Sequence, residues 1–175
     1  MKEKIFYIGH FVLAGVMVCW CLPTFALDSV ETYPPLKMHG TSYPNACADE
    51  ESQVLRDKIV ASKVAEASQL WQAVKIILCA PRSKRDRIFV AGLIPSKVRE
   101  VAESTGDTPS FRIVQRTPEL IEDVMAGGKA WDAEVSFDSR KLVLQYFVNE
   151  ACVKRITFIF QRSKWLVYSV GEACD

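Results

Sequence analysis

Apolar residues recur with a helical period in the first half of the chain. Between Ala46 and Ala80 there is neither glycine nor proline, and Asp49 supplies a capping carboxylate near the start of this window. Inside the window, apolar residues recur at spacings of three and four, which is the period of one helical face. This stripe comprises Val60, Val64, Ala67, Trp71, Val74 and Leu78. The pattern predicts helix, as one long piece or as two.

Shorter elements are predicted in the middle of the chain. One helix is expected to end near Gly92, and another to begin at Pro95 and stop at Gly106. A short strand is predicted over residues 111–115. Thr117 then caps a further helix, with proline at its first position and a glycine pair at its end.

The last third of the chain has the period of β-structure. Apolar and polar residues alternate from Trp131 to Asp138, which predicts one buried and one solvated face. Further strands rich in β-branched and aromatic residues are predicted over 142–148, 153–161 and 165–170. We therefore expect an α+β fold, with N-terminal helices packed on an antiparallel meander of about four strands.

The first 26 residues have the layout of a secretory signal peptide. Lys2 and Lys4 precede an apolar run over residues 5–22, and Thr24 and Ala26 stand at positions −3 and −1 of a cleavage site. Retention as a membrane anchor is the main alternative, because the run is close to the length of about 18 residues at which spanning becomes possible. The sequence favours cleavage and a periplasmic location.

The remaining chain is expected to form one domain. After the signal peptide (1–26), an irregular lead is predicted over 27–45 and a single α+β domain over 46–175. Lipidation at Cys19 or Cys21 is disfavoured, because the bulky Val18 and Trp20 precede them.

Composition excludes several classes of function. Removing Lys2, Lys4 and Glu3 from the 22 basic and 21 acidic residues leaves 20 of each, and this neutral balance argues against a nucleic-acid binder. His39 is the one histidine outside the signal peptide, so little supports a Ser-His-Asp triad or a histidine-rich metal site. Neither a G-x-S-x-G motif nor a glycine-rich phosphate loop is present. We expect no enzyme activity, cofactor or metal.

The cysteines predict disulfide bonds in an exported chain. If the final hairpin turns at Ser163, apolar residues pair across it, Lys154 faces Glu172, and Cys152 lies opposite Cys174. In detail, this register pairs Phe160 with Leu166, Phe158 with Tyr168, and Ile156 with Val170.

Cys47 and Cys79 then pair by elimination. One straight helix from Ala48 to Leu78 would place its two ends about 45 Å apart at a rise of 1.5 Å per residue, so the pairing predicts a break near residues 62–68. The alternative is that the cysteines are buried as free thiols.

Three C-terminal segments resemble the NTF2-like (cystatin-like cone) superfamily. They are Ala133–Phe137, Ile156–Phe160 and Trp165–Val170, within a match that covers about residues 111–170. The resemblance implies helices packed on a curved antiparallel sheet. It carries over no catalytic residues, because the positions used for proton chemistry in that superfamily have no clear counterparts here.

Three functional hypotheses remain open. The first is an exported protein that binds another protein, such as an immunity or inhibitor protein neutralising an envelope-targeting toxin. The second is an envelope component of a secretion or conjugation system, which favours a retained anchor. The third is a small-ligand-binding or enzymatic domain whose cavity uses Asp132, Glu134, Tyr146 and Glu150.

A basic cluster is the candidate partner-binding segment. It consists of Arg82, Lys84, Arg85 and Arg87, which could dock an acidic partner or anionic lipid headgroups. The alternative is an ordinary solvated loop, because Asp86 interrupts the cluster. Trp131 and Trp165 begin strands and are expected to be buried.

Overall fold

The computed structural model describes residues 41–102 and 110–174, all within one compact unit that runs from Lys37 to Asp175. The predicted signal peptide, Cys19, Cys21, His39 and most of the predicted lead lie outside the described residues. In chain order the elements are β1 (Thr41–Pro44), α1 (Asp49–Ala61), α2 (Ala67–Cys79), α3 (Lys84–Leu93), β2 (Lys97–Ala102), β3 (Ser110–Gln115), α4 (Pro118–Val124), β4 (Asp132–Asp138), β5 (Lys141–Phe147), β6 (Cys152–Gln161) and β7 (Lys164–Cys174).

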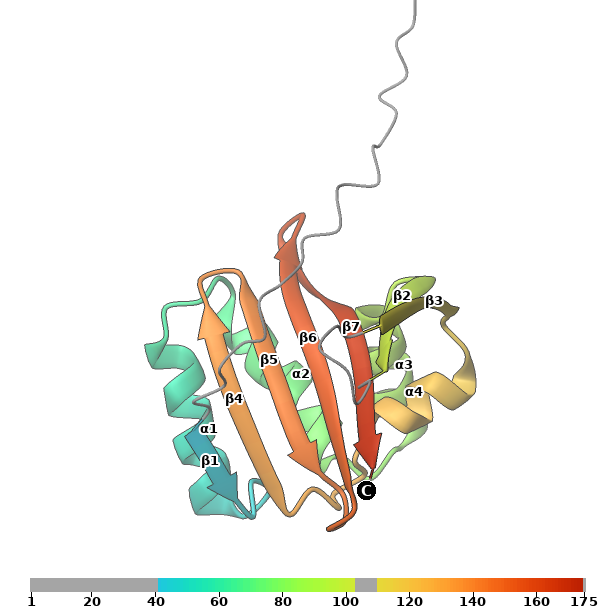
Figure 1. The fold of residues 1–175 in the computed structure, drawn as a ribbon. Coiled ribbons are helices and arrows are strands. Elements are labelled where there is room, and N and C mark those ends of the chain that lie inside the picture. The colour runs from blue at the N-terminus through green and yellow to red at the C-terminus, as the bar shows by residue number, and fades with distance from the viewer. Residues whose placement is uncertain (1–40, 103–109, 175) are drawn as a thin grey trace, which may run out of the picture. The chain divides into compact units, whose positions relative to one another are not determined.

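The described strands form one sheet in the order β1-β4-β5-β6-β7-β2-β3 (Figure 1). The expected α+β class and the meander β4-β5-β6-β7 are confirmed. The expectation of about four strands was wrong, because the sheet has seven, and β2 joins β7 in parallel. The helices are not confined to the N-terminal part, since α4 follows β3 in the chain.

Two strands arise where the sequence predicted something else. β1 lies inside the predicted irregular lead, where Tyr43 is buried and pairs with Ala133 of β4. The segment Lys97–Ala102, predicted as helix, is strand β2. Its helical pattern was weak and tertiary context decides the outcome, because β2 gains strand partners on both sides and buries Val98.

The predicted helical break is confirmed. α1 ends at Ala61 and α2 starts at Ala67, and a disulfide joins Cys47 to Cys79 across the helical hairpin. Ala48, rather than Asp49, occupies the N-cap of α1; Asp49 begins the helix, where its negative charge favours the helix dipole.

The final hairpin keeps the predicted register only at its open end. Cys152 pairs with Cys174 and Lys154 with Glu172, as expected. Near the turn, Phe158 pairs with Val167 and Phe160 with Trp165, so the predicted partners Tyr168 and Leu166 were wrong. The chain turns on Arg162 and Ser163 alone, both at positive φ, and a bulge beside Thr157 absorbs the offset.

The core lies between the helices and one face of the sheet. Alternate residues of β4 and β5 are buried on this face, and α2 contributes Leu70, Val74 and Leu78. Trp165 is buried as expected, and its indole N–H donates to the carbonyl of Ala65 at 2.7 Å. The other face of the sheet carries no described helix (Figure 1).

Candidate functional site

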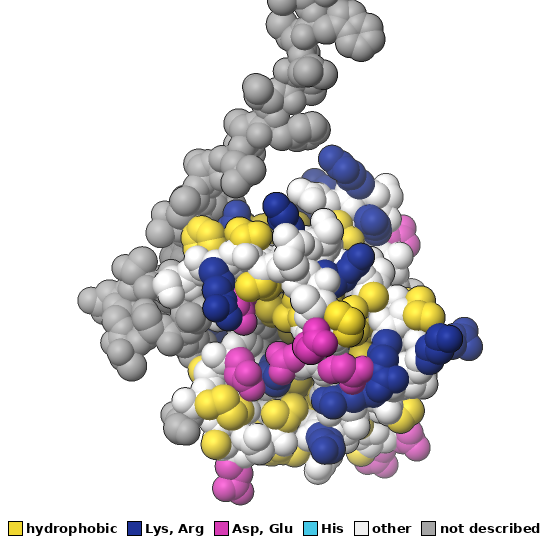
Figure 2. All heavy atoms as spheres, turned by 90° about the vertical axis from the view of Figure 1, so that its right-hand side faces the viewer, with side chains coloured by type: hydrophobic (Ala, Val, Ile, Leu, Met, Phe, Trp, Pro, Cys, Tyr) yellow, Lys and Arg dark blue, Asp and Glu magenta, His cyan; other side chains and the backbone are white. Residues whose placement is uncertain are grey.

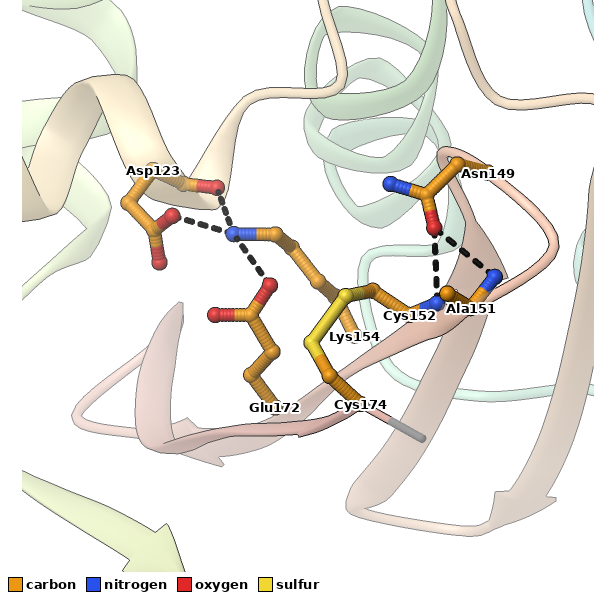
Figure 3. The surroundings of a disulfide bond; sticks show 7 residues. All are labelled: Asp123, Asn149, Ala151, Cys152, Lys154, Glu172 and Cys174. Carbon is orange, nitrogen blue, oxygen red and sulfur yellow. Dashed lines mark hydrogen bonds and ion pairs between the residues drawn. A yellow bond between two sulfur atoms is a disulfide. The ribbon is translucent and has the colours of Figure 1, made fainter.

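The C-terminal disulfide closes the last hairpin beside an ordered turn (Figure 3). Cys152 is bonded to Cys174, and the Asn149 side-chain oxygen accepts hydrogen bonds from the backbone N–H groups of Ala151 at 2.9 Å and Cys152 at 2.7 Å. The two sulfur atoms and the Glu172 carboxylate lie within 4.8 Å of one another. Because the sulfurs are bonded to each other, they are not available as thiolate metal ligands.

Lys154 is held between two carboxylates next to this disulfide (Figure 3). Its Nζ lies 3.4 Å from Glu172, and it donates to the Asp123 carbonyl at 3.1 Å and also to the Asp123 carboxylate. The Lys154 side chain is only 11% exposed, so this charge is compensated within the fold. The interaction connects β6, β7 and α4 and is structural in character.

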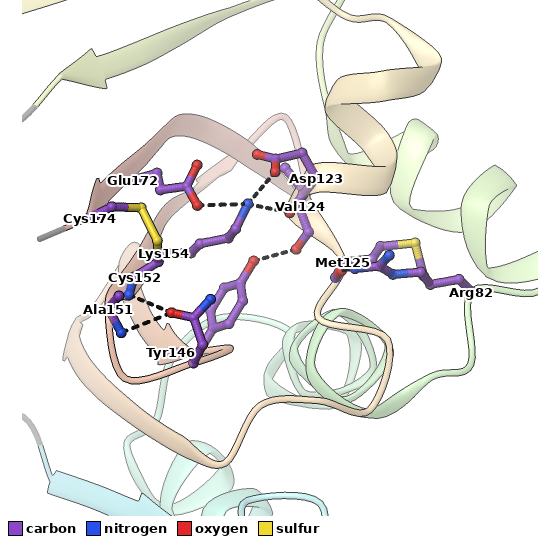
Figure 4. A network of polar contacts seen from close by, with 11 residues as sticks. Arg82, Asp123, Val124, Met125, Tyr146, Ala151, Cys152, Lys154, Glu172 and Cys174 are labelled. Atoms are coloured by element: carbon purple, nitrogen blue, oxygen red, sulfur yellow. Dashed lines mark hydrogen bonds and ion pairs between the residues drawn. A yellow bond between two sulfur atoms is a disulfide. The ribbon is translucent and has the colours of Figure 1, made fainter.

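Tyr146 points into the protein interior behind this network (Figure 4). Its side chain is fully buried, and its hydroxyl donates to the Val124 carbonyl at 2.5 Å. Burial, assisted by the negative charges of Asp123 and Glu172, raises the pKa of the Tyr146 phenol. The hydroxyl is thus a neutral donor that joins β5 to the end of α4.

The structure does not bring together the four residues expected to line a cone cavity. Tyr146 is sealed in the core, whereas Asp132 accepts a hydrogen bond from the Ser42 hydroxyl at 2.8 Å near the surface. Glu134 lies in β4 beside two buried residues that point to the opposite face. Glu150 lines a shallow hollow of about 560 Å³ with Trp131, which is 46% exposed. The predicted burial of Trp131 was wrong: it precedes β4 and packs against Phe147.

The basic cluster is divided between structural and exposed side chains. Arg82 donates to the Met125 carbonyl, and Figure 4 shows these two residues next to each other. Arg87 pairs with Glu122 of α4. Lys84 and Arg85 lie exposed in the first turn of α3. The cluster is therefore not one continuous cationic surface, and partner binding through it stays a prediction.

A second hollow, of about 590 Å³, lies beside Lys154. Its charged lining is balanced between the signs: Arg82, Lys129 and Lys154 against Glu119, Glu122 and Asp123. Most of these groups already have partners. Hydrogen bonding to backbone N–H and to Thr117 lowers the pKa of Glu119. The hollow offers no concentrated charge of one sign for a ligand.

The hairpin of β2 and β3 presents apolar residues to solvent. Phe111 is 46% exposed and Ile113 is 55% exposed. The Arg99 guanidinium lies 5.2 Å from the Phe111 ring centre and 4.6 Å from that of Tyr168. Figure 2 views the side of the molecule that carries these strands, where hydrophobic side chains reach the surface among basic and acidic ones.

This exposed surface was not predicted from the sequence. A strand over 111–115 was predicted and is confirmed, but its position at the edge of the sheet depends on pairing between β2 and β7. Since β2 was predicted as helix, the exposure of Phe111 and Ile113 at a sheet edge could not be predicted.

No family model and no curated protein matches the chain. Among solved structures, the chain is similar to an NTF-2 like protein of unknown function from Silicibacter pomeroyi DSS-3. The identity is 12%, the match covers 73% of this chain and 99% of that chain, and the TM-score is 0.34. The expected NTF2-like resemblance is thus found, but a likeness at this TM-score carries no argument about activity.

Proposed function

We propose that the chain is exported to the periplasm and acts by binding another protein. The observation that carries the binding role is the exposure of Phe111 and Ile113 on one strand, because adjacent exposed apolar side chains commonly mark interaction sites. In contrast, the polar groups near the C-terminal disulfide are engaged within the fold.

The two disulfides support the proposed periplasmic location. Such bonds persist in the periplasm and are rare in reducing compartments. Among the described residues, no helix is long and apolar enough to cross a membrane. An immunity or inhibitor role is the specific form of the proposal, in which the bound partner is an envelope-targeting toxin.

Affinity capture from the envelope fraction of the source cells tests the binding role. The full chain is tagged at its C-terminus, exported, purified without reductant and washed in high salt. We expect one protein to be retained at constant stoichiometry, and to be lost when the bait is reduced and alkylated. Retention of no protein would contradict the proposal. Recovery of a multiprotein assembly with an uncleaved bait would favour the envelope-component alternative.

A further inference from the structure

Within the described part of the chain, the edge strand β3 has backbone groups that pair with no other strand. β3 pairs with β2 and ends the described sheet. The backbone N–H of Arg116 donates to the backbone carbonyl of Ser96 at 3.0 Å. Hydrogen-bonded positions alternate along an antiparallel pair of strands. The even-numbered residues of β3 therefore bond to β2, and the N–H and C=O groups of Phe111, Ile113 and Gln115 point away from it.

The same three residues place their side chains on one face of the strand. Side chains alternate along a strand, so Phe111, Ile113 and Gln115 share a face, and Arg112 and Val114 lie on the other. Among the described residues, no strand pairs with this edge, which thus combines outward hydrogen-bonding groups with two exposed apolar side chains. Soluble proteins usually protect such an edge against pairing with another chain, so its exposure here points to an interaction site.

The charge of the two strands indicates the partner's chemistry. The described parts of this hairpin and Arg116 carry four cations and one acid: Lys97, Arg99, Arg112 and Arg116 against Glu100. Arg112 pairs with Glu100, yet its side chain remains 77% exposed. Residues 103–109, with Glu103 and Asp107, lie outside the described part and are not included in the site.

We propose that β3 binds an extended segment of a partner protein, with alternating apolar and acidic residues, as an added strand. The apolar residues pack on Phe111 and Ile113, and the acidic residues face Arg112 on the other side. A second copy of this chain is the disfavoured occupant, because self-pairing brings two cationic hairpins together. A register centred on Arg112 would also place two guanidinium groups opposite each other. This inference rests on the proposed protein-binding function and specifies its site.

Peptide binding to the full chain tests the inference. The probe is a capped nine-residue peptide that alternates valine and glutamate, and the control peptide alternates valine and lysine. We expect the glutamate peptide to bind at least about tenfold more tightly than the lysine peptide, with the difference shrinking as salt screens the charges. Equal affinity for both peptides, or binding of neither at millimolar concentration, would overturn the inference.

Amide hydrogen exchange supplies a readout that nonspecific adhesion would not produce. In the free chain we expect slow exchange at Arg112 and Val114 and fast exchange at Phe111, Ile113 and Gln115. The glutamate peptide should slow the exchange of the odd-numbered amides alone. Protection that does not follow this alternation would refute strand addition.

Substitutions distinguish binding at the edge strand β3 from nonspecific binding to exposed apolar side chains. Ile113→Pro removes an outward N–H without removing a bond to β2, and should weaken glutamate-peptide binding at least about tenfold. Ile88→Ser removes an exposed apolar side chain from α3 and should leave binding unchanged. If Ile113→Pro does not fold, Ile113→Ser in the same assay and the exchange pattern of the unaltered chain decide the matter.

The outcomes distinguish this inference from the proposed function. If the captured envelope protein binds Ile113→Pro as tightly as the unaltered chain, the edge-strand inference fails and the binding role stands. If capture yields no protein while the glutamate peptide binds with the expected protection, the edge site stands and the proposed function fails. A concentration-dependent dimer that Ile113→Pro abolishes would overturn the inference in favour of self-association.

Discussion

Removing each disulfide separately should destabilise the protein by unequal amounts. Their cysteines are 32 residues apart for Cys47–Cys79 and 22 for Cys152–Cys174. Loop-closure entropy alone assigns about 3.7 and about 3.4 kcal/mol to these bonds at 25 °C. This term barely separates the two, so any clear difference must come from the surroundings of the sulfur atoms.

The surroundings of the sulfur atoms predict a larger loss of stability when the Cys47–Cys79 bond of the helical hairpin (the helical pair) is removed. Cys47 and Cys79 are half-buried and pack against the hydrophobic core, whereas Cys174 is exposed. Serine at the helical pair places hydroxyls against apolar side chains, which adds about 1 kcal/mol. The β6–β7 pair joins neighbouring strands, and residual hairpin structure in the unfolded chain lowers its contribution. We expect Cys47→Ser/Cys79→Ser to cost about 4–5 kcal/mol and Cys152→Ser/Cys174→Ser about 2–3 kcal/mol.

Urea unfolding followed by tryptophan fluorescence measures both costs, since Trp165 is buried in the native protein. Each double variant is compared with the oxidised chain, and both should show a larger m-value because the unfolded chain is less constrained. A greater loss for the β6–β7 variant would refute the argument from core packing. Equal losses near the entropic values would show that the local environment contributes nothing.

Further tests address individual residues. Tyr146→Phe should cost about 1 kcal/mol at pH 7 through the lost hydrogen bond. The raised pKa keeps the Tyr146 phenol neutral in the folded protein, whereas in the unfolded chain this phenol ionises near pH 10, so the free energy of unfolding falls above that pH. Tyr146→Phe lacks this phenol and should therefore be no less stable than the unaltered chain at pH 11. Urea titrations of both proteins at pH 7 and pH 11 measure the difference. Gly127→Ala should be destabilising by more than about 1 kcal/mol, because Gly127 has φ +66° and an added Cβ would lie 2.7 Å from Arg82 Nε. Its control, Gly92→Ala, meets no atom within 4 Å and should stabilise α3 by up to about 1 kcal/mol in thermal unfolding. N-terminal sequencing of the exported protein should begin at Leu27, and a start at Met1 would indicate a retained anchor.

Long-range constraints in the sequence were sufficient for much of the fold. The distance between Cys47 and Cys79 along an unbroken helix required a hairpin, and the structure has one. The alternation of apolar residues and the expected pairing of Cys152 with Cys174 likewise predicted that β6 and β7 pair as a hairpin. These predictions succeeded because covalent geometry or a period of two leaves few alternatives.

The missed features depend on partners distant in sequence. β1 is four residues long and shows no alternation signal of its own; Tyr43 becomes buried only through pairing with β4. Val98 and Val101 suit a helix or a strand, and the neighbouring β7 and β3 select the strand. Arg82 could not be assigned its contact with Met125, because nothing local in the sequence links the two.

Tyr168 is the extra residue of β7 that forms the bulge opposite Thr157 and Phe158. With this residue in the strand, the bulge allows the two-residue turn and the pairing of Cys152 with Cys174 to occur in one hairpin. If the chain kept Tyr168 but formed no bulge, the two-residue reversal at Arg162 would place Cys152 opposite Ala173 and turn the Cys174 side chain toward the opposite face. Deleting Tyr168 should therefore leave a regular ribbon that keeps both the two-residue reversal and the disulfide, because every other pair of the ladder stays in step.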